Sequence, residues 1–141
     1  MISESDRHQN VAKTINSVVL DVGKLNRCLT LAIVSVDLNS ENFVYSSLGH
    51  PPAFLAKSSE NKVKHIRAAS PRLGAQKDLQ FRSGTGFLNS GDKLFCYTDG
   101  IFENRGQNNE LISEQDILKA LNADPSVVVN NNSIQKSMLN A

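Results

Sequence analysis

Residues 95–104 read FCYTDGIFEN, so an aspartate and a glycine come directly after a strand-forming run and directly before an amphipathic segment. The side chain of an aspartate can accept a hydrogen bond from the backbone N–H two residues further along the chain, and glycine tolerates a positive φ angle. The pair is therefore typical of a turn. A carboxylate at the end of a buried strand is also held rigidly, and Mg²⁺ and Mn²⁺ bind oxygen ligands of that kind. The stretch itself leaves both interpretations of Asp99 open.

The segments before this stretch predict antiparallel strands. A tight turn at residues 90–92 leads into a buried strand over 93–98. Residues 27–38 form a continuous apolar, β-branched run, typical of a strand covered on both faces, and a polar turn joins it to a second strand at 43–49. A further hairpin with polar alternation, and therefore nearer the surface, is expected over 53–67.

Helical spacing predicts a helix on either side of the strands. Over residues 7–26, polar side chains alternate with an apolar face made of Val11, Ile15, Val18, Val19, Val22 and Leu25. The segment SEQDILKALNA, residues 113–123, predicts a helix capped by Ser113, and a weaker pattern over 133–139 predicts a last one. The order along the chain is therefore helix, strands, helices.

The composition is that of a folded protein without a nucleic-acid footprint. Of the 141 residues 40% are hydrophobic, and 15 basic against 14 acidic side chains leave a net charge of +1. The longest apolar run, CLTLAIVSV, is far shorter than the roughly 20 residues of a membrane span, so no membrane segment is expected. A cytoplasmic location is expected for the chain. Cys28 and Cys96 lie in strand-like runs without metal-ligand spacing and are expected to be buried thiols. His8 and His65 are expected on the surface.

His50 lies in the turn LGHPP, residues 48–52, and two interpretations stay open for it. Gly49 allows a close approach of the backbone and the prolines stiffen the exit, so the imidazole can point into a site. The same residues are equally consistent with a plain turn that carries a surface histidine.

Three motifs in this order resemble the PPM-type metal-dependent protein serine/threonine phosphatases, in their SpoIIE and RsbU-like branch. They are LTLAIVSVDLNSENFVYSSLGHPPAFL at 29–55, RLG at 72–74 and LNSGDKLFCYTDGIFENR at 88–105, of which GD-x-L-x-x-YTDG-x-x-E is the most specific. The resemblance covers roughly residues 10–122. It implies an α+β fold in which two antiparallel sheets form a sandwich flanked by helices. Residues 1–141 are then expected to be a single, partial phosphatase domain, incomplete at both ends.

The same resemblance implies hydrolysis of phosphoserine or phosphothreonine by water that is activated between two Mn²⁺ or Mg²⁺ ions. Asp99 matches the aspartate of the family's TDG motif and is expected to bind metal, with Gly100 turning the backbone beside it. Glu103 matches a nearby acidic position close to the metal, and Gly49 and His50 match a turn near the site. The expected substrate is a bacterial regulatory phosphoprotein, such as an anti-sigma-factor antagonist.

The chemistry explains why metals are needed and why this chain alone is expected to be inactive. A phosphate monoester is dianionic and hydrolyses very slowly, so a catalyst must neutralise its oxygens and supply hydroxide at neutral pH, which two divalent ions do. One aspartate cannot hold two metals. The family's upstream GD segment and closing Asp-Asp strand have no match here, since Asp116 and Asp124 are the only aspartates after Asp99.

Two further hypotheses therefore stay open. One is a non-catalytic relative that keeps the fold as a regulatory or protein-binding module, and the other is an α/β domain in which Asp99 only turns the chain. Strands missing from the domain would leave open sheet edges, which invite pairing between chains. A homodimer or a swapped assembly is expected for this reason.

Overall fold

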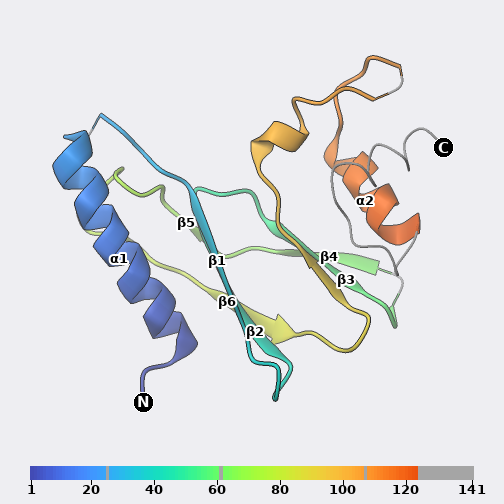
Figure 1. Cartoon of the computed structure of the whole chain (residues 1–141), viewed down its shortest axis with the longest axis horizontal. Helices are drawn as coiled ribbons and strands as arrows, with labels where there is room; N and C mark the ends of the chain where they lie inside the picture. Colours follow the sequence, from blue (N-terminus) through green and yellow to red (C-terminus); the bar gives the residue numbers. More distant parts are fainter. Residues whose placement is uncertain (25, 61, 107, 124–141) are drawn as a thin grey trace. The chain divides into compact units, whose positions relative to one another are not determined.

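The computed structural model describes residues 1–24, 26–60, 62–106 and 108–123 (Figure 1). The chain divides into two compact units, which are described separately below. Unit 1 consists of Met1–Pro52 and Ile66–Leu88, and unit 2 of Ala53–His65 and Asn89–Ala141. The expectation of a single partial domain over residues 1–141 stays a prediction. No helix in the described part of the chain is long and apolar enough to cross a membrane.

Unit 1 begins with helix α1, Glu4–Gly23. Ser3 caps it, because its Oγ accepts the backbone N–H of Asp6 at 3.1 Å. At the other end Lys24 adopts the left-handed conformation with φ 46°, and its N–H reaches the Leu20 carbonyl. These two caps place the helix a few residues earlier than the apolar pattern predicts.

The predicted apolar face of α1 is wrong in its details. Val11, Val18 and Val22 are 48%, 56% and 76% exposed, and the buried residues are instead His8, Ala12 and Asn16. The polar members of this row are buried because each has hydrogen-bond partners on the strands or loops beneath the helix. The surface position expected for His8 is therefore wrong as well. Leu25 lies outside the described residues.

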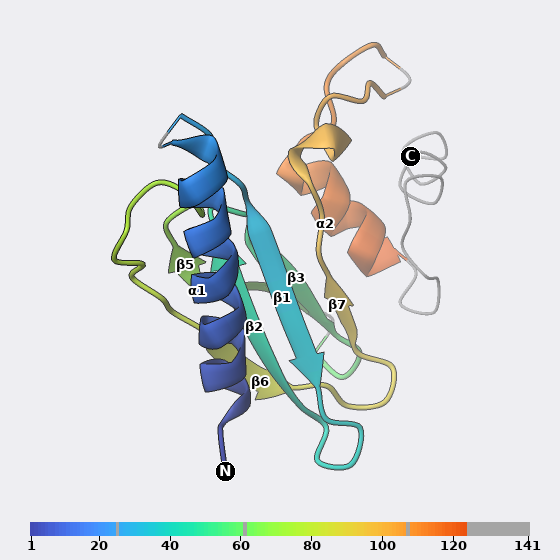
Figure 2. The same ribbon diagram turned by 60° about the vertical axis from the view of Figure 1, so that its left-hand side comes forward.

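The sheet of unit 1 is built around β2, Asn42–Leu48. It pairs antiparallel with β1, Leu31–Val36, antiparallel with β6, Gly84–Phe87, and in parallel with the short β5, Ala69–Ser70. Helix α1 packs on β2 (Figure 2). The predicted hairpin of β1 and β2 is confirmed, with Val36 opposite Phe43.

Strand β1 is not covered on both faces, contrary to the sequence prediction. Within the described residues it pairs only with β2, so it lies at the edge of its sheet. Val34 is 38% exposed and Val36 is 45% exposed. The apolar run shows that the strand is suited to burial, but it does not show which strands or helices lie against it within the described residues.

Unit 2 contains a second sheet with the order β4-β3-β7. Its strands are β3, Ala53–Lys57, β4, Lys62–Ile66, and β7, Lys93–Phe95, so the hairpin expected over 53–67 is confirmed. Strand β3 is central, however, and buries Ala53, Phe54 and Leu55, so the prediction of a surface hairpin fails for this strand. Strand β7 ends at Phe95, three residues earlier than predicted.

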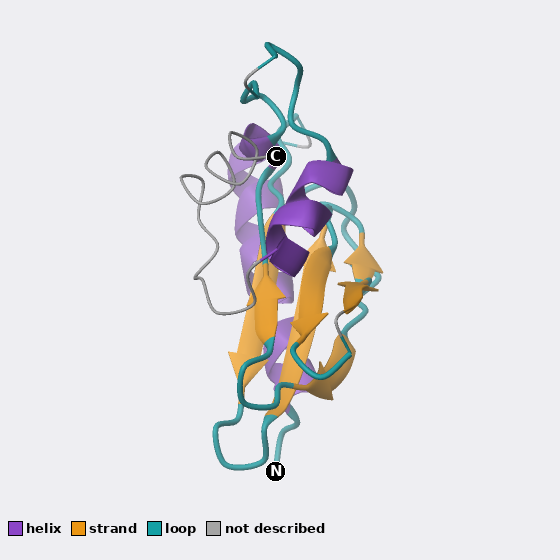
Figure 3. Cartoon of the chain, turned by 90° about the vertical axis from the view of Figure 1, so that its right-hand side faces the viewer, coloured by secondary structure: helices purple, strands orange, loops and turns teal. Residues whose placement is uncertain are grey.

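The core of unit 2 is aromatic. The Tyr97 ring stacks on Phe54 with 5.3 Å between centroids and on Phe95 with 5.9 Å, and Phe102 meets Tyr97 edge-on. Helix α2, Glu114–Ala123, adds Ile117 and Leu121 to this cluster. The predicted cap is confirmed, because Ser113 Oγ accepts the Asp116 N–H at 3.3 Å. Figure 3 distinguishes this helix from the loop that precedes it.

Two remaining expectations concern cysteines and the last helix. Cys28 and Cys96 are both exposed, so the prediction of buried thiols is wrong. Cys28 lies in the connection between α1 and β1, and Cys96 follows directly after the end of β7. The helix predicted over 133–139 lies outside the described residues.

Candidate functional site

Asp99 opens a short 3-10 helix, η1, Asp99–Ile101. Its own carbonyl accepts the Phe102 N–H at 2.9 Å, and the Thr98 carbonyl accepts the Ile101 N–H at 3.1 Å. The backbone here is therefore that of a tight turn. Asp99 is nevertheless exposed, so its carboxylate is open to a ligand from outside.

Two buried neighbours anchor the backbone that carries this carboxylate. Tyr97 is 8% exposed and Ile101 is 6% exposed, and both belong to the apolar cluster of unit 2. Asp99 thus stands between two anchored side chains, two residues from each. A carboxylate carried on such a turn loses little conformational freedom when it binds a cation.

Gly100 is not required by the geometry of this turn. Its φ angle is not in the left-handed region, and an added Cβ would meet only Thr98 Oγ1, at the ordinary contact distance of 3.7 Å. The expectation that Gly100 lets the backbone turn therefore has no steric support here. A place for Gly100 beside a metal stays a prediction.

Glu103 is exposed and follows η1 by two residues. Next to it, Asn104 Nδ2 donates to the Gly100 carbonyl at 3.0 Å and ties the following loop to the turn. The described residues contain no group of three or more His, Cys, Asp or Glu side chains that could hold a metal ion. Asp99 and Glu103 are therefore oxygen donors of the right kind, but not a complete metal centre.

The Gly49-His50 turn of unit 1 is held tightly to its own sheet. The Gly49 N–H donates to the Ser70 carbonyl at 2.9 Å, and Ser47 Oγ donates to the His50 carbonyl at 2.7 Å. Gly49 has φ +66°, and a Cβ there would clash with the Arg72 side chain. Glycine is therefore required at this position, as the sequence indicated.

His50 is partly buried, so it is not a plain surface histidine. Its Nδ1 is inaccessible to solvent and has no hydrogen-bond partner within the described residues. Buried polar atoms are normally hydrogen-bonded, and within the described residues His65 Nδ1 is the other buried side-chain atom without a partner. A direct role for Gly49 or His50 in a reaction stays a prediction.

The sequence predicts Asp92 in a tight turn but does not show what its side chain does. Its carboxylate accepts Lys57 Nζ at 2.7 Å, the Ser58 N–H at 3.0 Å and the Asn89 N–H at 2.9 Å. Burial alone would raise the pKa of Asp92, but these hydrogen bonds and the lysine charge lower it overall. The aspartate of the GD pair thus fixes the turn before β7.

Asn16 is a second residue whose role the sequence does not show, because the helical pattern places it among the polar residues of α1. It is 3% exposed, its Oδ1 accepts the Gly74 N–H at 2.7 Å, and its Nδ2 donates to the Gln76 carbonyl at 3.0 Å. Gly74 has φ +83°, and a Cβ there would lie 2.5 Å from Val19. The RLG motif thus lies where α1 closely contacts the loop around Gly74.

Comparison with known proteins agrees with these motifs. The family model described as Stage II sporulation protein E (SpoIIE) matches residues 1–136. The chain is 27% identical over 98 residues to "Phosphoserine phosphatase RsbU" of Bacillus subtilis, which covers 70% of the chain and 29% of that protein. It is 26% identical over 104 residues to "Phosphoserine phosphatase RsbP" of the same organism, which covers 73% of the chain and 24% of that protein. The chain thus spans less than a third of the length of these relatives.

Solved structures show the fold. The RsbU and RsbW domains of Rv1364c from Mycobacterium tuberculosis match with a TM-score of 0.67 at 21% identity, over 98% of this chain and 38% of that one. The phosphatase domain of SpoIIE from Bacillus subtilis, presoaked with Mn, matches with a TM-score of 0.53 at 19% identity, over 99% and 59%. The expected α+β phosphatase fold is confirmed. The chain belongs to the SpoIIE family, a family of protein serine/threonine phosphatases.

Proposed function

We propose that the protein containing this chain hydrolyses phosphoserine or phosphothreonine in a partner protein, with two Mn²⁺ or Mg²⁺ ions as cofactors. The observation that carries the proposal is Asp99, an exposed carboxylate held between Tyr97 and Ile101 within the YTDG-x-x-E motif. When bound, the ions would lower the pKa of water and neutralise the phosphoryl oxygens. Mn²⁺ and Mg²⁺ share oxygen ligands, so the chemistry of the donors does not distinguish them.

The proposed roles follow the chemistry of each side chain. Asp99 provides an oxygen ligand to a metal ion, with the backbone of Gly100 beside it. Glu103 lies close to the metal and adds negative charge, which strengthens cation binding. For Gly49 and His50 the proposal keeps what the resemblance implies, a turn near the metal centre of the family. Further carboxylates must complete the ligand set.

The substrate is proposed to be a small regulatory phosphoprotein, such as an anti-sigma-factor antagonist. The relatives named phosphoserine phosphatase support phosphoserine as the group that is hydrolysed. A role in bacterial signal transduction and stress response, in the cytoplasm, follows from the same proposal.

A homodimer or a swapped assembly is also proposed. The edge position of β1 among the described residues supports it, because an edge strand offers its backbone groups, and here two exposed valines, to a second chain. The phosphatase domain of SpoIIE from Bacillus subtilis has been solved in a crystal form without domain swapping. Swapping is therefore a property to test in this chain.

The alternative is a non-catalytic regulatory or protein-binding module. It is favoured by one observation, that no cluster of three potential metal ligands exists among the described residues. The exposure and rigid placement of Asp99 favour the catalytic proposal instead, since a module without metals has no need of a carboxylate there.

Calorimetric titration with Mn²⁺ tests the role of Asp99 on which the catalytic proposal rests. The catalytic proposal expects saturable Mn²⁺ binding by the chain and a loss of affinity of at least about tenfold, or roughly 1.4 kcal/mol, in Asp99→Asn. Asp21→Asn, which changes an exposed aspartate of α1, serves as the control and should bind like the wild type. Absence of Mn²⁺ binding by a chain shown to be folded would contradict a metal site at Asp99 in this chain, and would fit either the non-catalytic module or a centre that only further carboxylates complete.

A further inference from the structure

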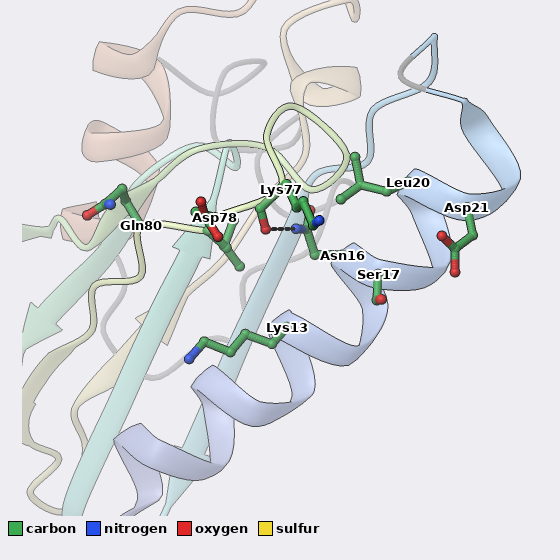
Figure 4. A pocket seen from close by; sticks show the side chains of 9 residues that line it. Lys13, Asn16, Ser17, Leu20, Asp21, Lys77, Asp78 and Gln80 are labelled. Atoms are coloured by element: carbon green, nitrogen blue, oxygen red, sulfur yellow. Dashed lines mark hydrogen bonds between the residues drawn. The ribbon is translucent and has the colours of Figure 1, made fainter.

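Unit 1 contains a pocket of about 720 Å³ between α1 and the segment 77–80. Figure 4 shows Lys13 extending from the helix, and Asp78 and Gln80 projecting from the facing segment. The helix wall presents Lys13, Ser17, Leu20 and Asp21, which succeed each other at helical spacing. The pocket is in the range of 300–1,000 Å³, roughly, that is usual for ligand sites.

The segment that forms the second wall is held in place. Asn16 fixes its beginning by donating to the Gln76 carbonyl, and the side chain of Leu79 packs against the apolar cluster of Ala12, Leu48 and Leu73. The pocket is therefore preformed, and a ligand would not have to order the wall when it binds.

Four charged side chains line this pocket: Lys13, Asp21, Lys77 and Asp78. All four are exposed, and none forms an ion pair with another residue in the part of the chain that the structure describes. Two cations and two anions thus line one cavity without an ion-pair partner among the described residues. Lys13 and Asp21 are eight residues apart on α1, which separates them by about 12 Å along the helix axis.

This arrangement restricts the kind of ligand. The two lysines and two aspartates leave the lining without net charge, so charge alone favours neither a polyanion such as a nucleic acid nor a simple cation. An extended peptide can place an acidic and a basic side chain several ångströms apart, with an apolar side chain between them for Leu20 and Leu79. Complementary charges of this kind increase specificity and the rate of association more than the affinity.

We propose that this pocket is a docking site for an extended segment of a partner protein that carries an acidic and a basic side chain on either side of an apolar one. The proposal goes beyond the phosphatase function and does not depend on it, because docking requires neither a metal nor Asp99. It predicts binding that weakens as salt concentration rises, since exposed charge pairs are screened.

The test uses a fluorescein-labelled peptide with a central leucine, glutamates on one side of it and lysines on the other. Fluorescence anisotropy is expected to show saturable binding of this peptide to the chain without metal. Ser17→Trp should weaken binding by about tenfold or more, because the indole fills the pocket from an exposed position. Val18→Trp is the matched control, since Val18 is 56% exposed on the same helix and does not line the pocket.

Two further measurements check the charges. Peptides of the same length with only glutamates or only lysines should bind less tightly than the mixed peptide. The double variant Lys13→Gln, Lys77→Gln should weaken the mixed peptide and serves as a second test if Ser17→Trp fails to fold. The proposal is overturned if the mixed peptide shows no saturable binding, if a peptide of a single charge sign binds more tightly, or if Val18→Trp weakens binding as much as Ser17→Trp.

Discussion

At the scale of single residues, Gly49 and Gly100 each lie in a turn within a quoted motif, but their backbone conformations differ. Gly49 has φ +66°, and a Cβ there would clash with Arg72 Cγ and lie 3.2 Å from Arg72 Cα. Gly49→Ala should therefore lower the free energy of unfolding by about 1–3 kcal/mol, through strain in the left-handed region and displacement of Arg72. Urea unfolding followed by circular dichroism measures the change.

Gly100→Ala is the matched control, because its Cβ has room and its φ angle is ordinary. A change within about 0.5 kcal/mol is expected for it. The double variant Gly49→Ala, Arg72→Ala should recover the part of the loss that comes from the side-chain clash. Equal stability of the two single alanine variants would contradict the strained conformation of Gly49.

The residues that sequence reasoning found and missed differ in where their partners lie. Asp99 and Ser113 could be predicted because the features that define them, a turn and a helix cap, lie within a few residues along the chain. The role of Asn16 could not be predicted, since its partner Gly74 is 58 residues away along the chain. A single asparagine in a helix is normally interpreted as solvent-exposed. Asp92 was visible in the GD motif, but only the contacts with Lys57 and Ser58 show what it does.

At the scale of elements, the attachment of α1 to its sheet depends on a buried imidazole. His8 is 3% exposed, its Nδ1 lies 2.9 Å from Ser46 Oγ on β2, and its Nε2 lies 2.7 Å from Ser35 Oγ on β1. Burial lowers the pKa of His8 below its usual 6.5, and the charge of Glu4 opposes this only in part. The groups that face the ring from the strands are uncharged hydroxyls.

This shift makes the stability of the chain depend on pH in a defined direction. Because the folded state has the lower pKa, the unfolded chain binds more protons as the pH falls below 6.5. The contribution of neutral His8 is therefore complete above that value and is lost as the pH falls through it towards the folded pKa. The free energy of unfolding should decrease between about pH 7.5 and 5.5.

His8→Gln isolates this contribution, because glutamine can still bond a serine but does not titrate in this range. Urea unfolding at the two pH values should show a smaller decrease for His8→Gln than for the wild type. His65→Gln is the comparison, since His65 is 29% exposed in its side chain and pairs with Glu114. An identical pH dependence of the wild type and His8→Gln would show that His8 does not account for the effect.

The elements themselves could be predicted where the pattern is local. The hairpin of β1 and β2 and helix α2 follow from runs of residues bounded by turns or a cap. The buried face of α1 could not, because Val11, Val18 and Val22 define the more apolar side, whereas hydrogen bonds select the side that carries His8 and Asn16. Hydrophobic periodicity indicates which face of a helix is apolar, but it does not indicate which face has hydrogen-bond partners in the folded protein.

At the scale of the whole molecule, the order of the motifs identified the family while the active centre stayed incomplete. The family model matches residues 1–136, in agreement with motifs quoted from 29–105. A metal centre of several carboxylates depends on residues far apart in the chain, and Asp99 with Glu103 does not form one within the described residues. Spacing along the sequence therefore predicts a fold more completely than a site.

The edge of β1 leads to a prediction about assembly. Val34 and Val36 are 38% and 45% exposed on a strand that pairs only with β2 among the described residues, so a second copy can extend the sheet there. Sedimentation velocity should show a dimer whose fraction increases with concentration, and Val36→Lys should shift it towards monomer, because a lysine on an edge strand opposes pairing. Val22→Lys, at a 76% exposed position on α1, should leave the equilibrium unchanged. If both variants shift it equally, association depends on general surface hydrophobicity; if the wild type stays monomeric at every concentration, the β1 edge does not pair in solution.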